Sequence, residues 1–130
     1  MNNSQEMTTK RILLVDDEAI VRKTCVRMLT RMGYEVLDAP DGQRAIDLYR
    51  QHWQTISVVM LDMIMPEMNG NVIFEQLRAV NPRARVIFSS GYPQDDLVDA
   101  LSMDSTVAFV KKPFGLKELM DTVHRVSVTA

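Results

Sequence analysis

Residues 12–18 read ILLVDDE, four apolar residues followed at once by three acidic ones. An uninterrupted apolar run of this length is typical of a strand that is covered on both faces, as in a parallel sheet. The period changes directly afterwards, because apolar residues from Val21 to Met32 recur at helical spacing and Gly33 follows where a helix would end. Residues 12–33 are therefore predicted to form a buried strand followed by an amphipathic helix.

The same alternation of strand and helix continues to the end of the chain. An edge strand with one face exposed to solvent is predicted at 34–39, and a second helix at about 41–51. The remaining predicted elements are strands at 58–61, 86–88 and 107–110, and helices at about 71–80, 94–101 and 116–127. Five strands alternating with five helices predict an α/β fold, with a five-stranded parallel sheet between two helical layers and right-handed crossovers.

Composition narrows the class of protein. The chain has 130 residues, 46% of them hydrophobic and 25% charged, which suits one globular domain. The net charge of −2 argues against a broad electrostatic contact with nucleic acid or an anionic membrane. Cys25 is the one cysteine, so an intramolecular disulfide is excluded, and we interpret it as a small core residue. No apolar run approaches the roughly 18 residues that span a membrane, and we expect a cytoplasmic protein.

Polar side chains follow the predicted strands where each strand ends. Asp16 and Asp17 follow the first strand, Asp62 the third, Ser90 the fourth and Lys112 the fifth. In open α/β sheets, ligands bind outside the carboxyl ends of the strands. We therefore expect these five residues to meet in one pocket.

The pocket suits phosphoryl chemistry. Three carboxylates that lie close together repel each other unless a cation is present, and Mg²⁺ prefers oxygen ligands. Asp17 and Asp62 are expected to be direct ligands, with Asp16 acting through a coordinated water. Lys112 adds a positive charge, which favours an ionised Asp62 able to accept a phosphoryl group. The Ser90 hydroxyl can then donate a hydrogen bond to a phosphoryl oxygen.

Four segments in this order resemble the receiver domain of two-component response regulators. They are LLVDDE at 13–18, LDMIMPEMNG at 61–70, SGY at 90–92 and FVKKPF at 109–114. The resemblance covers about residues 10–127. It implies a flavodoxin-like fold with strand order 2-1-3-4-5, with a flexible segment at 1–9 and the receiver domain at 10–130.

The resemblance also assigns roles to individual residues. It implies Asp62 as the phosphoacceptor, and Mg²⁺ as the cofactor of the acidic pair and Asp62. The backbone carbonyl of Ile64 would be a further metal ligand. The other implied roles belong to the last two strands: Ser90 as the switch hydroxyl, Lys112 as the phosphate-binding lysine, Phe109 as the aromatic coupled to that hydroxyl, and a cis peptide before Pro113.

The function implied by the resemblance is a signalling switch that modifies itself and is not a turnover enzyme. A histidine kinase or a histidine phosphotransfer protein would phosphorylate Asp62. Phosphorylation would change the face formed by 94–101, 107–110 and 116–127, which a downstream protein would read and which is also open to homodimerisation. No output domain is visible, so we expect a stand-alone regulator or a receiver excised from a larger kinase or regulator. Neither nucleic acid nor membrane is an expected partner.

Two other classes of protein use a related architecture. A magnesium-dependent phosphohydrolase with an aspartyl nucleophile requires a second Asp two residues after the first, and Ile64 occupies that position. A flavodoxin requires a phosphate-binding loop rich in Ser, Thr and Gly after the first strand. The acidic residues at 16–18 would repel a flavin phosphate instead.

Overall fold

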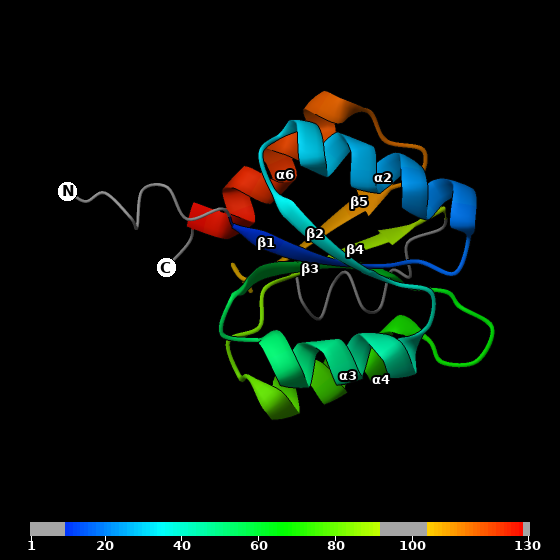
Figure 1. The fold of residues 1–130 in the computed structure, drawn as a ribbon, viewed down its shortest axis with the longest axis vertical. Helices are drawn as coiled ribbons and strands as arrows, with labels where there is room; N and C mark the ends of the chain where they lie inside the picture. The colour runs from blue at the N-terminus through cyan, green and yellow to red at the C-terminus, as the bar shows by residue number, and fades with distance from the viewer. Residues whose placement is uncertain (1–9, 92–103, 129–130) are drawn as a thin grey trace.

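The structure is a computed structural model that describes residues 10–91 and 104–128 (Figure 1). The strands are β1 (Arg11–Val15), β2 (Glu35–Ala39), β3 (Ile56–Asp62), β4 (Val86–Ser90) and β5 (Val107–Lys111). The helices are α2 (Ala19–Arg31), α3 (Gly42–His52), α4 (Gly70–Val80) and α6 (Leu116–Val128). The predicted helix at 94–101 and the predicted flexible segment at 1–9 lie outside the described residues. Within the described residues, no helix is both long and apolar enough to cross a membrane.

The five strands form one parallel sheet in the order β2-β1-β3-β4-β5, which confirms the predicted fold. The central strands β1, β3 and β4 are buried almost throughout, as their continuous apolar runs predict. β2 lies at one edge of the sheet and exposes Glu35 and Asp38, which confirms the predicted solvent-exposed edge strand.

Helices cover both faces of the sheet (Figure 1): α2 and α6 pack on one face, α3 and α4 on the other. Alternate residues of each strand feed the two cores, because side chains in a strand point to opposite faces. In β1, Leu13 and Val15 join the core under α3 and α4, whereas Ile12 and Leu14 join the core under α2 and α6. The sheet thus separates two hydrophobic layers.

Local capping fixes where the helices begin and end. Asp41 accepts a hydrogen bond from the backbone N–H of Arg44 at 2.7 Å, at the start of α3. Asn69 accepts one from the N–H of Val72 at 3.2 Å, so α4 begins at Gly70, one residue earlier than the predicted start. Gly33, with φ +96°, follows α2 at the predicted place.

Candidate functional site

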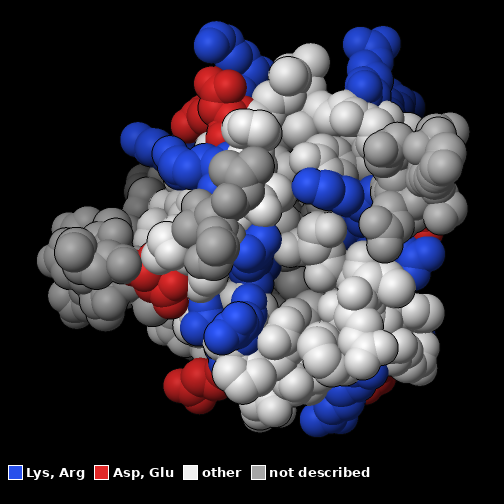
Figure 2. All heavy atoms as spheres, turned by 90° about the vertical axis from the view of Figure 1, so that its left-hand side faces the viewer, with Lys and Arg blue, Asp and Glu red and all other residues white. Residues whose placement is uncertain are grey.

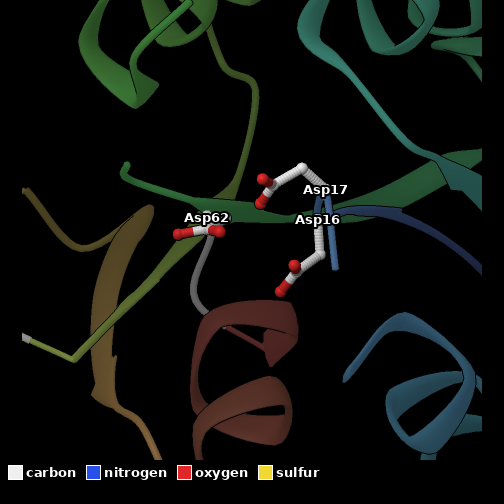
Figure 3. A group of neighbouring side chains, drawn as sticks. All are labelled: Asp16, Asp17 and Asp62. Atoms are coloured by element: carbon white, nitrogen blue, oxygen red, sulfur yellow. The ribbon is translucent and has the colours of Figure 1, made fainter. Parts of the chain in front are cut away.

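Three carboxylates meet at the carboxyl edge of the sheet. Asp16 and Asp17 follow β1, and Asp62 is the last residue of β3. One carboxylate oxygen from each lies within 4.8 Å of the other two, around a common space (Figure 3). Asp16 and Asp62 are buried, with 3% and 4% of their surface exposed, whereas Asp17 is exposed. The structure therefore brings together the acidic residues that the sequence placed at strand ends.

The Lys112 ammonium lies between the two buried carboxylates. Its Nζ is 2.9 Å from Asp16 Oδ2 and 3.3 Å from Asp62 Oδ2. Burial alone would lower the pKa of Lys112, but the hydrogen bond and charge of Asp16 and the charge of Asp62 outweigh it, and the pKa is raised. This lysine is therefore cationic at neutral pH and offsets part of the negative charge.

Burial has the opposite consequence for Asp62. Desolvation raises the pKa of this carboxyl group above its ordinary value of 3.8. The Lys112 charge and the hydrogen bond from the Ile64 N–H lower it again, but they do not fully compensate. The charged form of Asp62 is thus held at a cost in free energy that a second cation would reduce.

Backbone groups hold the two buried carboxylates in place. Asp16 Oδ1 accepts a hydrogen bond from the Glu18 N–H at 2.9 Å, and Asp62 Oδ1 accepts one from the Ile64 N–H at 3.2 Å. Arg22 Nη1 donates to the backbone carbonyl of Asp16 at 2.8 Å, which ties the loop to α2. The carboxylates are consequently oriented before any ligand arrives.

The other predicted site residues lie on the neighbouring strands β4 and β5. Ser90 is buried at the end of β4, and its carbonyl accepts a hydrogen bond from the Lys112 N–H at 2.8 Å. Phe109 of β5 is half-buried and stacks on Phe88, with ring centroids 5.4 Å apart. The peptide bond between Lys112 and Pro113 is cis. Ser90 and Lys112 are thus next to each other in space.

The donor set fits a magnesium ion. All three side chains offer carboxylate oxygens, the ligands that Mg²⁺ takes in proteins, together with several waters that it retains. Asp17 lies on the solvent side and also lines an open hollow of about 210 Å³ beside the loop at 65–68, so water can reach this side of the cluster. Ile64, whose carbonyl is a predicted ligand, lies in the loop that begins directly after Asp62.

Cys25 lies close enough to the site to sense its charges, yet it is not a reactive group. Burial raises the pKa of its thiol to about 11, and the negative charge of Asp16 adds to the rise. Because the thiolate is the reactive form, a thiol with this pKa is inert at neutral pH. The interpretation of Cys25 as a core residue agrees with its burial.

Two residues that hold the site were missed in the sequence. Gly70 was read only as a turn former, but its N–H donates to the carbonyl of Met63 at 2.7 Å, directly after Asp62. A Cβ on Gly70 would lie 2.8 Å from the Met63 Cα and 3.3 Å from the carbonyl oxygen of Asp62. The role of Arg22 in holding Asp16 had no signal in the sequence, because it depends on how α2 turns back over the strand end. Tyr92 of the SGY segment lies outside the described residues.

The sequence of this chain matches a known protein family and several curated proteins. A family model of the response regulator receiver domain matches residues 12–124. The sensor kinase CckA of Brucella abortus is 38% identical over 115 residues, which are 88% of this chain but only 12% of the kinase. The chemotaxis protein CheY of Thermotoga maritima is 31% identical over 119 residues, which are 91% of this chain and 98% of that protein.

A solved structure agrees with these matches. The CheX–CheY–BeF3–Mg complex of Borrelia burgdorferi contains a chain that superposes with a TM-score of 0.88 at 28% identity, covering 98% of this chain and 96% of that one. The fold is accordingly flavodoxin-like and similar to that of CheY. On the matched family model, the site at the strand ends and these relatives, the chain belongs to the response regulator receiver domains of two-component systems.

Proposed function

We propose that Asp62 accepts a phosphoryl group and so acts as the switch of a two-component pathway. The observation that carries the proposal is the contact of one ammonium, Lys112 Nζ, with both Asp16 and Asp62 inside a cluster of three carboxylates. A nucleophilic carboxylate, an adjacent cation and a set of metal-ligating oxygens are the groups that phosphoryl transfer to a carboxylate requires. The site therefore supplies positioning and charge neutralisation more than acid–base chemistry.

The chemistry assigns each group one task. Asp62 attacks phosphorus, so that a P–O bond forms as the P–N bond to the donor histidine breaks. Lys112 neutralises charge on a phosphoryl oxygen, and the Ser90 hydroxyl donates a hydrogen bond to another. Mg²⁺, held by Asp17, Asp62 and the carbonyl of Ile64, with Asp16 acting through a water, would neutralise the charge that builds up during transfer.

The partners follow from the same proposal. A histidine kinase or a histidine phosphotransfer protein donates the phosphoryl group, and a downstream protein reads the face formed by 94–101, β5 and α6. The matched relatives support either a receiver within a larger protein or a stand-alone one. The sensor kinase is matched over only 12% of its length, whereas the CheY protein of Thermotoga maritima is matched over 98%. We further propose a cytoplasmic location and no turnover chemistry beyond slow loss of the protein's own acyl phosphate.

Intact-mass analysis tests the proposal directly. The chain is incubated with Mg²⁺ and acetyl phosphate, beside Asp62→Asn and beside Asp121→Asn, which removes an exposed carboxylate on α6. We expect one labile phosphoryl adduct on the parent and on Asp121→Asn, none on Asp62→Asn, and none with chelator. An adduct that survives in Asp62→Asn, or no adduct at any Mg²⁺ concentration, would refute the assignment.

A phosphohydrolase would require a different set of side chains at this site. It needs a second carboxylate two residues after the nucleophile, and the side chain there is the apolar, 54% exposed Ile64. Release of many phosphate ions per protein molecule from a phosphate ester would favour that class. A receiver domain releases only the phosphoryl group that it has accepted.

A further inference from the structure

A second pocket lies at the opposite edge of the sheet, where the strands begin. It has a volume of about 390 Å³ and is formed by segments far apart in the sequence. Lys10 precedes β1, Arg83 and Arg85 precede β4, and Trp53 follows α3. None of these residues belongs to the carboxylate cluster, which lies at the carboxyl ends of the same strands.

The charge of this pocket is opposite to that of the whole chain. Three of its lining residues are cations and none of the described ones is acidic, although the chain carries a net charge of −2. Figure 2 shows Lys and Arg side chains near the middle of this face as well as around its rim, whereas Asp and Glu lie toward the rim. Clustered cations in a concave surface raise the local concentration of anions.

Two of the cations have no competing partner within the described chain. In residues 10–91 and 104–128, neither Lys10 nor Arg83 pairs with a carboxylate, whereas the adjacent Arg11 is bound to Glu35. Arg85 Nη1 donates to the carbonyl of Ser127 at 2.8 Å, which fixes its guanidinium at the pocket wall. Among the residues that the structure describes, no carboxylate therefore neutralises the charges of Lys10 and Arg83.

The segment that carries both arginines is held by its own hydrogen bonds. Asn81 Oδ1 accepts from the Arg83 N–H at 3.1 Å, and the Asn81 carbonyl accepts from the Ala84 N–H at 2.9 Å. Asn81 Nδ2 in turn donates to the Tyr49 hydroxyl at 3.1 Å, which anchors the turn to α3. A cation presented by a fixed backbone costs less ordering free energy when it binds a ligand.

The pocket also has an aromatic wall. Trp53 is half-buried and lines it together with the buried Tyr49. Ser127 Oγ is buried without a hydrogen-bond partner among the described residues, and Ser127 lines the same pocket. Cations beside aromatic surface suit a ligand that carries both phosphate and a ring.

We propose that this pocket binds a small phosphorylated ligand of mononucleotide size, with Lys10, Arg83 and Arg85 around its phosphates and Trp53 beside its ring. The volume favours a small molecule, because it lies near the lower limit of the roughly 300–1,000 Å³ of ligand pockets. The binding is distinct from phosphorylation of Asp62 and does not depend on it.

The lone tryptophan gives a direct assay. Trp53 is the one Trp of the chain, so its fluorescence reports on this pocket alone. The full chain carrying Asp62→Asn is titrated in chelator with tripolyphosphate, followed by fluorescence, and with adenosine triphosphate, followed by calorimetry. Both conditions exclude chemistry at the carboxylate cluster. We expect saturable binding at one site that weakens as salt is added.

Paired variants locate the site. We expect the double variant Lys10→Ala, Arg83→Ala to weaken binding at least about tenfold, because each lost charge-assisted hydrogen bond costs about 1.5–3 kcal/mol. The control Lys23→Ala, Arg44→Ala removes the same charge from exposed positions on α2 and α3 and should bind as the parent does. Circular dichroism checks that all variants are folded.

The outcomes separate the sources of the signal. Tighter binding of the nucleotide than of tripolyphosphate would support the placement of Trp53 beside the ring, and equal binding would refute that placement. Equal weakening by both double variants, or no binding at millimolar ligand, would overturn the proposal. So would a single-stranded RNA or a polyglutamate peptide that binds through Lys10 and Arg83 more tightly than either phosphate compound.

Discussion

Replacing Gly70 with Ala tests whether the loop after Asp62 depends on the missing side chain. Gly70 and Gly42 are both the first residue of a helix, after the capping residues Asn69 and Asp41. A Cβ on Gly70 would lie 2.8 Å from the Met63 Cα, a backbone atom. A Cβ on Gly42 would also meet close neighbours, at 2.8 and 2.9 Å, but these are the ends of the flexible side chains of Ile73 and Met68. Gly42→Ala is therefore a matched control.

The two substitutions should differ in free energy of unfolding. Without a clash, Gly→Ala stabilises a protein by about 0.4–1 kcal/mol, because the unfolded chain loses freedom. Overpacking against a rigid neighbour costs about 1–3 kcal/mol, and the hydrogen bond from Gly70 to Met63 is worth about 1 kcal/mol more. We expect Gly70→Ala to destabilise by about 1–3 kcal/mol. The cost of Gly42→Ala should be smaller by about 1 kcal/mol or more, because side-chain ends can move aside.

Urea unfolding followed by Trp53 fluorescence measures both variants. Phosphorylation by acetyl phosphate gives a second readout, because displacement of Met63 would also displace Asp62. We expect a slower reaction in Gly70→Ala and a nearly unchanged one in Gly42→Ala. If Gly70→Ala is as stable as the parent and reacts as fast, the backbone contact does not constrain the loop and the reasoning fails.

Two more substitutions test burial at the site and in the core. Because the folded-state pKa of Asp62 is raised, its contribution to stability is present below pH 3.8 and lost as pH rises through the folded pKa. In chelator, Asp62→Asn should therefore gain stability relative to the parent as pH rises from the acid range to neutrality. Thermal melts in which this difference stays constant, or in which the parent gains on the variant, would contradict the prediction. Phe88→Ala should cost about 3–5 kcal/mol, since Phe88 is fully buried between Phe74 and Phe109. The half-buried Phe109→Ala should cost less, and an equal loss in urea unfolding would show that exposure does not set the cost.

The fold could be predicted because its signals are local. The run at 12–15 shows by itself that β1 is covered on both faces, and the charged residues Glu35 and Asp38 show that β2 is not. Asp16, Asp17 and Asp62 could be grouped because parallel strands bring their carboxyl ends to one edge.

What the sequence could not predict depends on atoms that meet only in the folded chain. The sequence predicted that Lys112 lies in the pocket, but not that its ammonium contacts both Asp16 and Asp62. The close approach of Gly70 to Met63 depends on how α4 leaves the sheet. The basic pocket was missed because its cations, Lys10 and Arg83, are some seventy residues apart and look like ordinary surface charges one at a time.

The position of Lys112 means that the acidic cluster has a resident counter-ion of its own. A divalent ion that arrives there does not meet bare carboxylates, because Asp16 and Asp62 already share one ammonium. The ammonium offsets one of the three negative charges, so the attraction of the cluster for a metal would be smaller than that of three bare anions. A smaller attraction would make a bound metal easier to release. The loading of the site would then follow the concentration of free cation in its surroundings.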